Sequence, residues 1–170
     1  IVPRGQQQRS FLPDGTLAGK TFTAKYGYVG ISVENDAFVM EGINEAGLGV
    51  GLFYFPQYGE YQPYDPQKKE QSVSDMQLAA WILSSFASIN ELQAAMPQIR
   101  VIATDPRAST VHWRITESSG RQVVLEIVNQ HVHFYENPLG VLTNSPDFGW
   151  HLTNLNNYVN LSAGSINHRQ

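Results

Sequence analysis

The chain has 170 residues, of which 42% are hydrophobic and 15% are charged, and this balance predicts a folded domain with a core rather than a disordered tail. Its net charge of −4, with no long basic run, argues against nucleic acid as a partner. No stretch approaches the roughly 18 apolar residues that a membrane-spanning helix needs, so we expect no membrane partner.

Cysteine is absent, which excludes disulfides, thiolate metal sites and a cysteine nucleophile within these residues. A cysteine-free chain is compatible with any compartment. Because no signal peptide is visible, we favour the cytoplasm and otherwise leave the compartment open.

Strand patterns dominate the first third of the chain. They cover residues 20–33 (one or two strands), 38–41 and 48–55. Residues 1–19 are expected to be extended and loop-like because proline and glycine punctuate them. The stretch 48–55 is almost uncharged, and its Gly49 and Gly51 predict close approach by another backbone or a ligand.

A long loop and two helices follow. Residues 56–71 are polar and rich in tyrosine and proline, which predicts a loop that is functional or mobile. Ser74 is a candidate cap for a helix whose apolar positions end at Phe86. Ser88 and Glu91 form a capping-box pattern that opens a second, short helix before Pro97.

The remainder of the chain predicts a meander of strands and a last helix. The strands are expected at residues 111–116, 122–128 and 132–135. Trp150, Leu152, Leu155 and Tyr158 fall on roughly one face of the last helix. The order of strands, two helices, strands and a helix predicts an α+β fold in which helices cover antiparallel sheets.

Asn144 is the candidate functional residue that the pattern itself suggests. It precedes Ser145 and Pro146, and Pro146 should end a strand there, leaving Asn144 at the strand tip. An amide in that position can point two N–H donors into a cleft and form part of an oxyanion hole. The alternative is an asparagine that merely forms the turn between strand and helix.

The sequence gives little support for a metal site, a phosphate-binding loop or a serine nucleophile. His131 and His133 share one face of a predicted strand, but no further ligand lies at metal-binding spacing, so a solvent-facing surface is the preferred interpretation. Residues 47–51 have the wrong glycine spacing for a phosphate loop. No known serine-nucleophile motif is present, and we expect neither a metal nor another cofactor.

Several blocks of the sequence resemble the choloylglycine hydrolase family, which contains bacterial bile salt hydrolases and penicillin V acylases. The most specific blocks are E-G-I-N-E-A-G-L at residues 41–48 and G-V-L-T-N-S-P at residues 140–146. Further blocks lie at residues 1–4, 25–30, 111–113, 116–120 and 150–158, so the resemblance spans nearly the whole chain.

The resemblance implies a four-layer αββα N-terminal nucleophile hydrolase fold that cleaves linear amide C–N bonds. In this family an N-terminal cysteine attacks the amide, and its own α-amine serves as the base. Asn144 matches the side-chain donor of the oxyanion hole, and Tyr54 matches the position whose backbone N–H is the second donor. Tyrosine at that position favours a penicillin V acylase, whereas asparagine is usual in bile salt hydrolases.

The family's nucleophile should lie upstream of Ile1, and another active-site arginine beyond Gln170. Residues 1–170 would then be the central portion of a single domain, and we expect this portion alone to be inactive. The alternative is a binding descendant that has lost its nucleophile. The resemblance also implies a homotetramer, and Tyr58 and Tyr61 in the loop 56–71 are candidate contacts for the acyl group of a small amide substrate.

Overall fold

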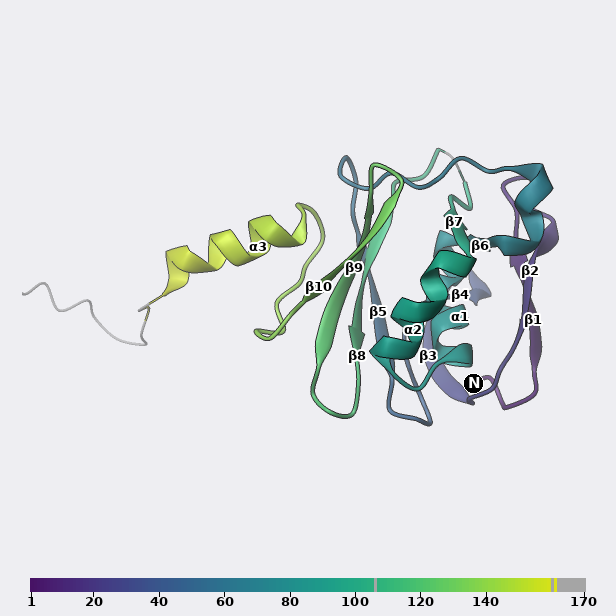
Figure 1. Ribbon diagram of the computed structural model, residues 1–170, viewed down its shortest axis with the longest axis horizontal. Helices are drawn as coiled ribbons and strands as arrows, with labels where there is room; N and C mark the ends of the chain where they lie inside the picture. The colour runs from purple at the N-terminus through teal and green to yellow at the C-terminus, as the bar shows by residue number, and fades with distance from the viewer. Residues whose placement is uncertain (106, 160, 162–170) are drawn as a thin grey trace, which may run out of the picture.

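A six-stranded antiparallel sheet lies at the centre of the computed structural model, which describes residues 1–105, 107–159 and 161 (Figure 1). Its strand order is β10-β9-β8-β5-β4-β3. The strands are β3 (Tyr28–Val33), β4 (Asn35–Asn44), β5 (Gly49–Tyr54), β8 (Val111–Thr116), β9 (Gln122–Val128) and β10 (His131–Glu136). The predicted strands 48–55, 111–116, 122–128 and 132–135 are confirmed to within two residues at each end.

Strand β5 is internal and joins the two halves of the sheet. It pairs with β4 on one side and with β8 on the other, where Tyr54 lies opposite Val111. A Cβ atom at Gly49 would lie only 2.6 Å from Thr116 Oγ1 of β8, so a larger residue cannot fit there without a shift. The close approach that this glycine predicts is therefore made by a neighbouring side chain within the sheet.

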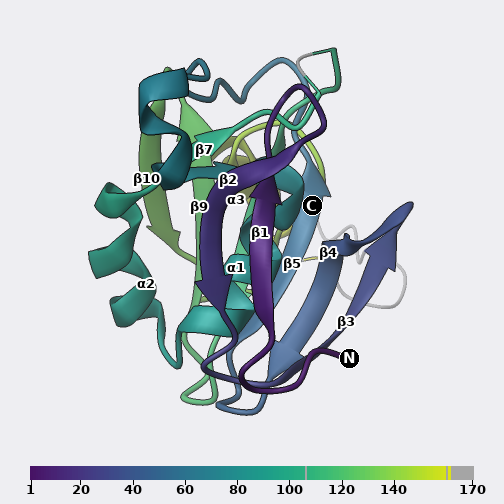
Figure 2. The same ribbon diagram turned by 90° about the vertical axis from the view of Figure 1, so that its right-hand side faces the viewer.

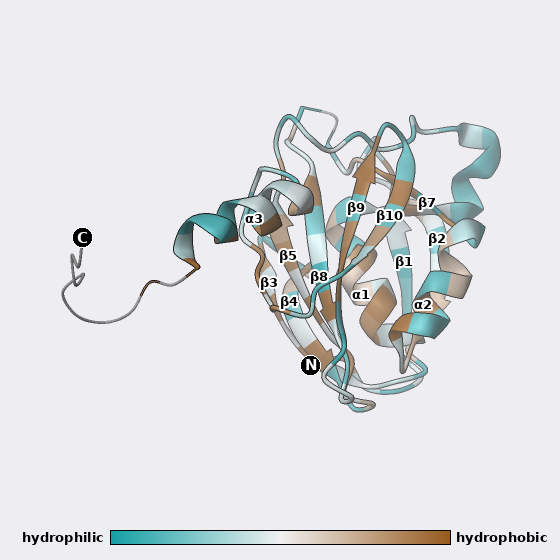
Figure 3. Ribbon diagram, turned by 60° about the vertical axis from the view of Figure 1, so that its left-hand side comes forward, coloured by the Kyte–Doolittle hydropathy of each residue, from teal (hydrophilic) through white to brown (hydrophobic). Residues whose placement is uncertain are grey.

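Helices α1 (Asp75–Ser85) and α2 (Ile89–Ala95) cover one face of the sheet (Figures 1 and 2). The core lies between them, with Leu78 and Ile82 of α1 packed in one cluster with Trp113 and Ile115 of β8. Helix α1 is hydrophobic over its middle turns, residues 78–83 (Figure 3), and buried almost all round, as expected for a helix between two layers. Among the described residues, no helix combines the length and hydrophobicity that crossing a membrane requires.

A two-stranded hairpin forms the layer beyond α1 (Figure 2). It consists of β1 (Gln7–Phe11) and β2 (Leu17–Thr23), whereas the sequence predicts only an extended, loop-like segment before residue 20. Gln77 of α1 binds the hairpin, since its Oε1 accepts from Phe11 N–H at 2.6 Å and its Nε2 donates to Arg9 O at 3.1 Å. The predicted strand region 20–33 is split between β2 and β3.

The loop after β5 and the start of α2 agree with the patterns, whereas Ser74 stands at the N-cap of α1 without a side-chain capping hydrogen bond. Residues 56–65 have no helix or strand, and the 3-10 helix η1 (Pro66–Gln71) completes this connection. Ser88 Oγ accepts from Glu91 N–H at 3.2 Å, as the capping-box pattern predicts. The sequence analysis missed one short pair of parallel strands, β6 (Ser72–Ser74) and β7 (Arg100–Ile102). The 3-10 helix η2 (Met96–Gln98) precedes β7.

The prediction of a strand that ends at Asn144 is wrong. Residues 137–147 contain no strand, and the chain crosses the sheet as an irregular segment after β10. The Asn137 side chain makes hydrogen bonds that a partner strand would otherwise make. Its Oδ1 accepts from Val141 N–H and its Nδ2 donates to Val141 O, both at 3.1 Å. Leu142 then packs with Val124 and Phe148 on the sheet face opposite α1.

The last helix is confirmed as α3 (Phe148–Leu155), continued by the 3-10 helix η3 (Asn156–Tyr158). Asp147 caps α3 by accepting from Trp150 N–H at 3.0 Å. The face that the sequence predicts as inward is largely exposed, since Trp150, Leu152 and Tyr158 face solvent. Phe148 and His151 are buried instead, because only the first turns of α3 contact the sheet (Figure 1).

Candidate active site

Asn144 lies in the turn of residues 143–148, called here the Asn144 turn, beside the end of β5. The Tyr54 backbone N–H donates to Asn144 Oδ1 at 2.8 Å. An N–H can only donate, so this contact fixes which end of the Asn144 amide is the oxygen. Asn144 is exposed, and its Nδ2 makes no hydrogen bond to any described residue, so both Nδ2 hydrogens are open to a ligand.

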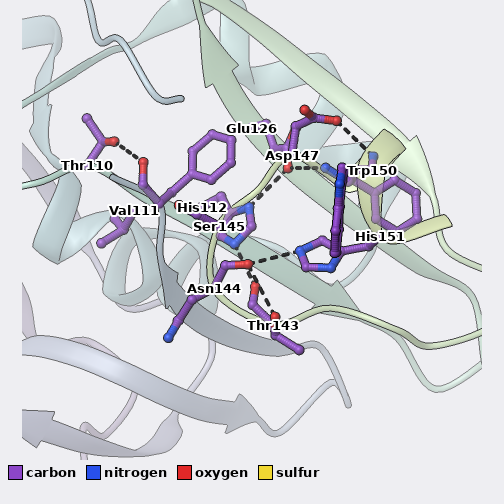
Figure 4. A network of polar contacts seen from close by, with 12 residues as sticks. Thr110, Val111, His112, Glu126, Thr143, Asn144, Ser145, Asp147, Trp150 and His151 are labelled. Carbon is purple, nitrogen blue, oxygen red and sulfur yellow. Dashed lines mark hydrogen bonds and ion pairs between the residues drawn. The ribbon is translucent and has the colours of Figure 1, made fainter. Parts of the chain in front are cut away.

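The turn is fastened to β5 and to α3 by further hydrogen bonds. Ser145 N–H donates to Tyr54 O at 2.9 Å, and Ser145 Oγ donates to Pro56 O at 3.0 Å. Nε2 of the buried His151 donates to the backbone oxygen of Asn144 at 2.9 Å (Figure 4). The Ser145–Pro146 peptide bond is cis. Asn144 is thus held on both its side-chain oxygen and its backbone oxygen.

A buried pair of polar side chains lies beneath the turn. His112 of β8 and Glu126 of β9 are 0% and 1% exposed, with His112 Nδ1 at 3.0 Å from Glu126 Oε1. His112 Nε2 lies 2.9 Å from Thr143 O, and Glu126 Oε1 also accepts from Phe148 N–H at 2.9 Å (Figure 4). Sequence reasoning missed this pair, because polar residues within a strand are expected to face solvent unless something covers them, and no local pattern shows that cover.

The three predicted tyrosines have different surroundings. Tyr54 is 51% exposed, and its hydroxyl donates to Ser109 Oγ at 2.8 Å. Tyr58 is 40% exposed and stacks on Phe55, with ring centroids 5.7 Å apart. Both side chains are therefore partly accessible to solvent.

The predicted substrate contact of Tyr61 is not supported, because Tyr61 belongs to the hydrophobic core. Its hydroxyl donates to Val111 O at 3.1 Å and accepts from Val111 N–H at 2.7 Å. Burial raises the pKa of the Tyr61 hydroxyl well above its ordinary value. The loop 56–71 thus turns one of its tyrosines inward, a distinction that composition cannot make.

This arrangement suits stabilisation of a developing negative charge. Fixed amide donors act on an oxyanion without having to reorganise during the reaction. Within the described part of the chain, no group of three or more His, Cys, Asp and Glu side chains is placed to hold a metal ion. His131 Nδ1 instead contacts Asn129 O at 2.6 Å, and both His131 and His133 are exposed.

Comparisons with known proteins agree with this geometry. A bile salt hydrolase/transferase from Clostridium perfringens is 33% identical over 153 residues, which are 86% of this chain and 46% of that protein. A penicillin V acylase from Pectobacterium atrosepticum is 29% identical over 157 residues, 85% of this chain and 41% of that protein. The chain thus spans about half the length of the curated relatives that it matches.

A crystal structure of a mutant conjugated bile acid hydrolase from Clostridium perfringens superimposes with a TM-score of 0.80 at 29% identity. The match covers 99% of this chain and 51% of that one, which confirms that the chain forms part of an N-terminal nucleophile hydrolase fold. The family model described as linear amide C–N hydrolases, choloylglycine hydrolase family, matches residues 7–170. The chain therefore belongs to the choloylglycine hydrolase family of linear amide C–N hydrolases.

Proposed function

We propose that the complete protein hydrolyses a linear amide and that Asn144 Nδ2 stabilises the oxyanion formed during attack. The observation that carries this proposal is the 2.8 Å contact from Tyr54 N–H to Asn144 Oδ1, which turns the amide hydrogens of Asn144 outward. The role of Tyr54 in the proposal follows from the same contact. Its N–H directs the Asn144 amide in this structure. The role of second donor that family resemblance adds would require this one hydrogen to be shared between Asn144 Oδ1 and the oxyanion.

In the proposed reaction, the thiolate of an N-terminal cysteine, supplied by a segment upstream of these residues, attacks the amide carbon. The carbonyl oxygen then becomes negative and accepts a hydrogen bond from Asn144 Nδ2. Collapse of this intermediate breaks the C–N bond, and the cysteine α-amine transfers the thiol proton to the departing amine. Water then cleaves the thioester and releases the carboxylic acid. Residues 1–170 would be the central portion of the single domain that performs these steps.

For the substrate we propose an amide with an aromatic acyl group, such as penicillin V. Tyr54 and Tyr58 support this class, because both expose ring surface and Tyr54 is bound through its backbone to Asn144. Conjugated bile salts are the second candidate, which is supported by the 33% identity with the Clostridium bile salt hydrolase/transferase. The ratio of kcat/KM for penicillin V and for a glycine-conjugated bile salt, measured by amine release, decides between the two.

The proposed role of Asn144 is tested in the complete polypeptide with Asn144→Ala. We expect kcat to fall by about 10²–10³ and KM to change little, because the interaction is made mainly in the transition state. Asn90→Ala serves as the control. Asn90 is exposed on α2, which covers the sheet face opposite Asn144, and its side chain accepts from Arg121. A kcat for Asn144→Ala within threefold of the parent would refute the role.

We further propose that the complete protein is a cytoplasmic homotetramer, as family resemblance implies. Exposed hydrophobic side chains on the outer part of the sheet, such as Ile31, are compatible with cover by further chain or by a neighbouring subunit. Light scattering on the purified complete protein measures the assembly. Fractionation of the source cells measures the compartment.

A further inference from the structure

The His112–Glu126 pair combines complete burial with contacts to the backbone of the Asn144 turn. Val111, Trp113 and Ile115 of β8 point into the core beneath the helices. His112 alternates with them and therefore points to the opposite face of the sheet, where Asn144 lies. Its imidazole is 0% exposed and stacks on Phe55, with centroids 4.2 Å apart and planes 10° apart.

The hydrogen positions of this pair follow from its partners. A carbonyl oxygen can only accept, so His112 Nε2 carries a hydrogen and donates it to Thr143 O at 2.9 Å. The 3.0 Å contact between His112 Nδ1 and Glu126 Oε1 requires one proton between the two atoms. With that proton the pair carries no net charge, whichever of the two atoms binds it.

The two side chains hold opposite ends of the same turn. His112 binds Thr143 O, one residue before Asn144, and Glu126 Oε1 accepts from Phe148 N–H, where α3 begins (Figure 4). Between these points, Ser145 is bound to Tyr54 of β5. The donor Asn144 thus lies on a short segment whose two ends are fixed by one buried pair.

We propose that His112 and Glu126 are positioning residues that set the place of the Asn144 amide for catalysis. Stability alone does not require such a pair, because well-packed hydrophobic residues often replace a buried polar pair without loss. Glu126 Oε2 is buried and has no hydrogen-bond partner among the described residues, which adds to the cost of keeping the carboxyl group there. Directional contacts to Thr143 and Phe148 are what hydrophobic side chains could not supply. The inference rests on the proposed role of Asn144.

Two substitutions of His112 separate its two contacts. Glutamine can place an amide N–H near the position of Nε2 and so retain the bond to Thr143 O, whereas asparagine can place one near Nδ1 and retain only the bond to Glu126. In the complete enzyme we expect His112→Asn to lower kcat by about 10²-fold with little change in KM, as for a misplaced catalytic group. We expect His112→Gln to retain at least tenfold more of kcat than His112→Asn.

A second readout does not depend on activity. The NMR resonances of the Asn144 side-chain amide should shift in His112→Asn and stay near the parent position in His112→Gln. Gln77→Ala is the control for general destabilisation, because buried Gln77 binds Phe11 and Arg9 on the far side of α1. It should lower the melting temperature without lowering kcat.

Equal losses of kcat in His112→Asn and His112→Gln, together with unshifted Asn144 amide resonances in both, would overturn the inference. The failure of the proposed function has a different signature. An unsubstituted complete protein that releases no amine from either substrate class would refute amide hydrolysis, and the Asn144 resonances would still decide whether His112 positions that amide.

Discussion

At the scale of single residues, Asn144 shows how one hydrogen bond gives an amide a direction. Its Oδ1 faces a backbone N–H of Tyr54, so its Nδ2 hydrogens must face outward. Asn144→Asp keeps the oxygen that Tyr54 binds but replaces the donor by a second acceptor. Its effect on kcat should equal or exceed that of Asn144→Ala, because a carboxylate also repels an oxyanion.

Tyr58 and Tyr61, three residues apart, should respond oppositely to substitution. Tyr61→Phe leaves the buried N–H and O of Val111 without their partner, so we expect a loss of about 1–3 kcal/mol in the free energy of unfolding and an unchanged KM. Tyr58→Leu, on the exposed side, should raise KM for an aromatic amide and leave stability within about 1 kcal/mol of the parent. Denaturant unfolding and steady-state kinetics of the complete protein measure both. A raised KM in Tyr61→Phe would contradict the structural role of Tyr61.

At the scale of elements, the block E-G-I-N-E-A-G-L at residues 41–48 is explained by the connection it forms between β4 and β5. Asn44 Nδ2 donates to Leu83 O at 2.9 Å and to Phe86 O at 2.7 Å, so it binds the last carbonyls of α1. Its Oδ1 accepts from Ala46 N–H at 3.1 Å and from Leu48 N–H at 3.0 Å. Gly47 adopts a φ of +84°, which favours glycine. This specific block of the family pattern is therefore structural.

Substitution of Asn44 should therefore act on stability. Asn44→Ala leaves two carbonyls of the α1 terminus and two N–H groups of the turn without their partner, so we expect a loss of roughly 2–4 kcal/mol in the free energy of unfolding. Asn35→Ala is the matched control, since Asn35 also lies on β4 but is exposed, and among the described residues its side chain accepts from Ala37 N–H alone. Urea denaturation of the complete protein measures the difference. Equal stability of the two variants would contradict this account of Asn44.

At the scale of the whole molecule, the sheet is covered unequally. One face carries α1 and α2 (Figure 1), whereas on the other face, among the described residues, the segment 137–155 packs on β9 through Leu142 and Phe148. Val29 and Ile43 lie opposite each other on β3 and β4, each 51% exposed, and Ile31 is 70% exposed on the same face. A hydrophobic sheet surface of this kind is typical of an interface with another layer or subunit.

Residues 1–170 produced alone should therefore bind a hydrophobic dye and self-associate, and should not hydrolyse penicillin V. Ile31→Thr should reduce dye binding, because it removes the most exposed side chain of this face. Leu17→Thr is the control, because Leu17 is also an exposed hydrophobic residue but lies on the β1–β2 hairpin. It should reduce dye binding less than Ile31→Thr. Dye fluorescence and sedimentation velocity measure these effects. A monodisperse monomer that does not bind dye, or one that turns over penicillin V, would contradict the prediction.

The sequence by itself determined the elements with strong local patterns and the family. Period-two alternation marks β8, the turns that follow mark β9 and β10, the capping box marks the start of α2, and the T-N-S-P block marks Asn144. These signals are readable because they depend on neighbours within a few residues along the chain. The same locality explains the error at residues 140–143, where a strand-like pattern has no partner strand and instead packs across the sheet face.

Only the tertiary structure decided which polar groups meet. Tyr54 and Asn144 are 90 residues apart in sequence, and His112 and Thr143 are 31 apart, yet both pairs lie within 3 Å of each other. Whether a tyrosine, histidine or glutamate is buried or exposed also depends on which distant parts of the chain pack over it, as Tyr61, His112 and Glu126 show. Burial and hydrogen-bond partners of this kind are set by long-range packing, which no local pattern in the chain encodes.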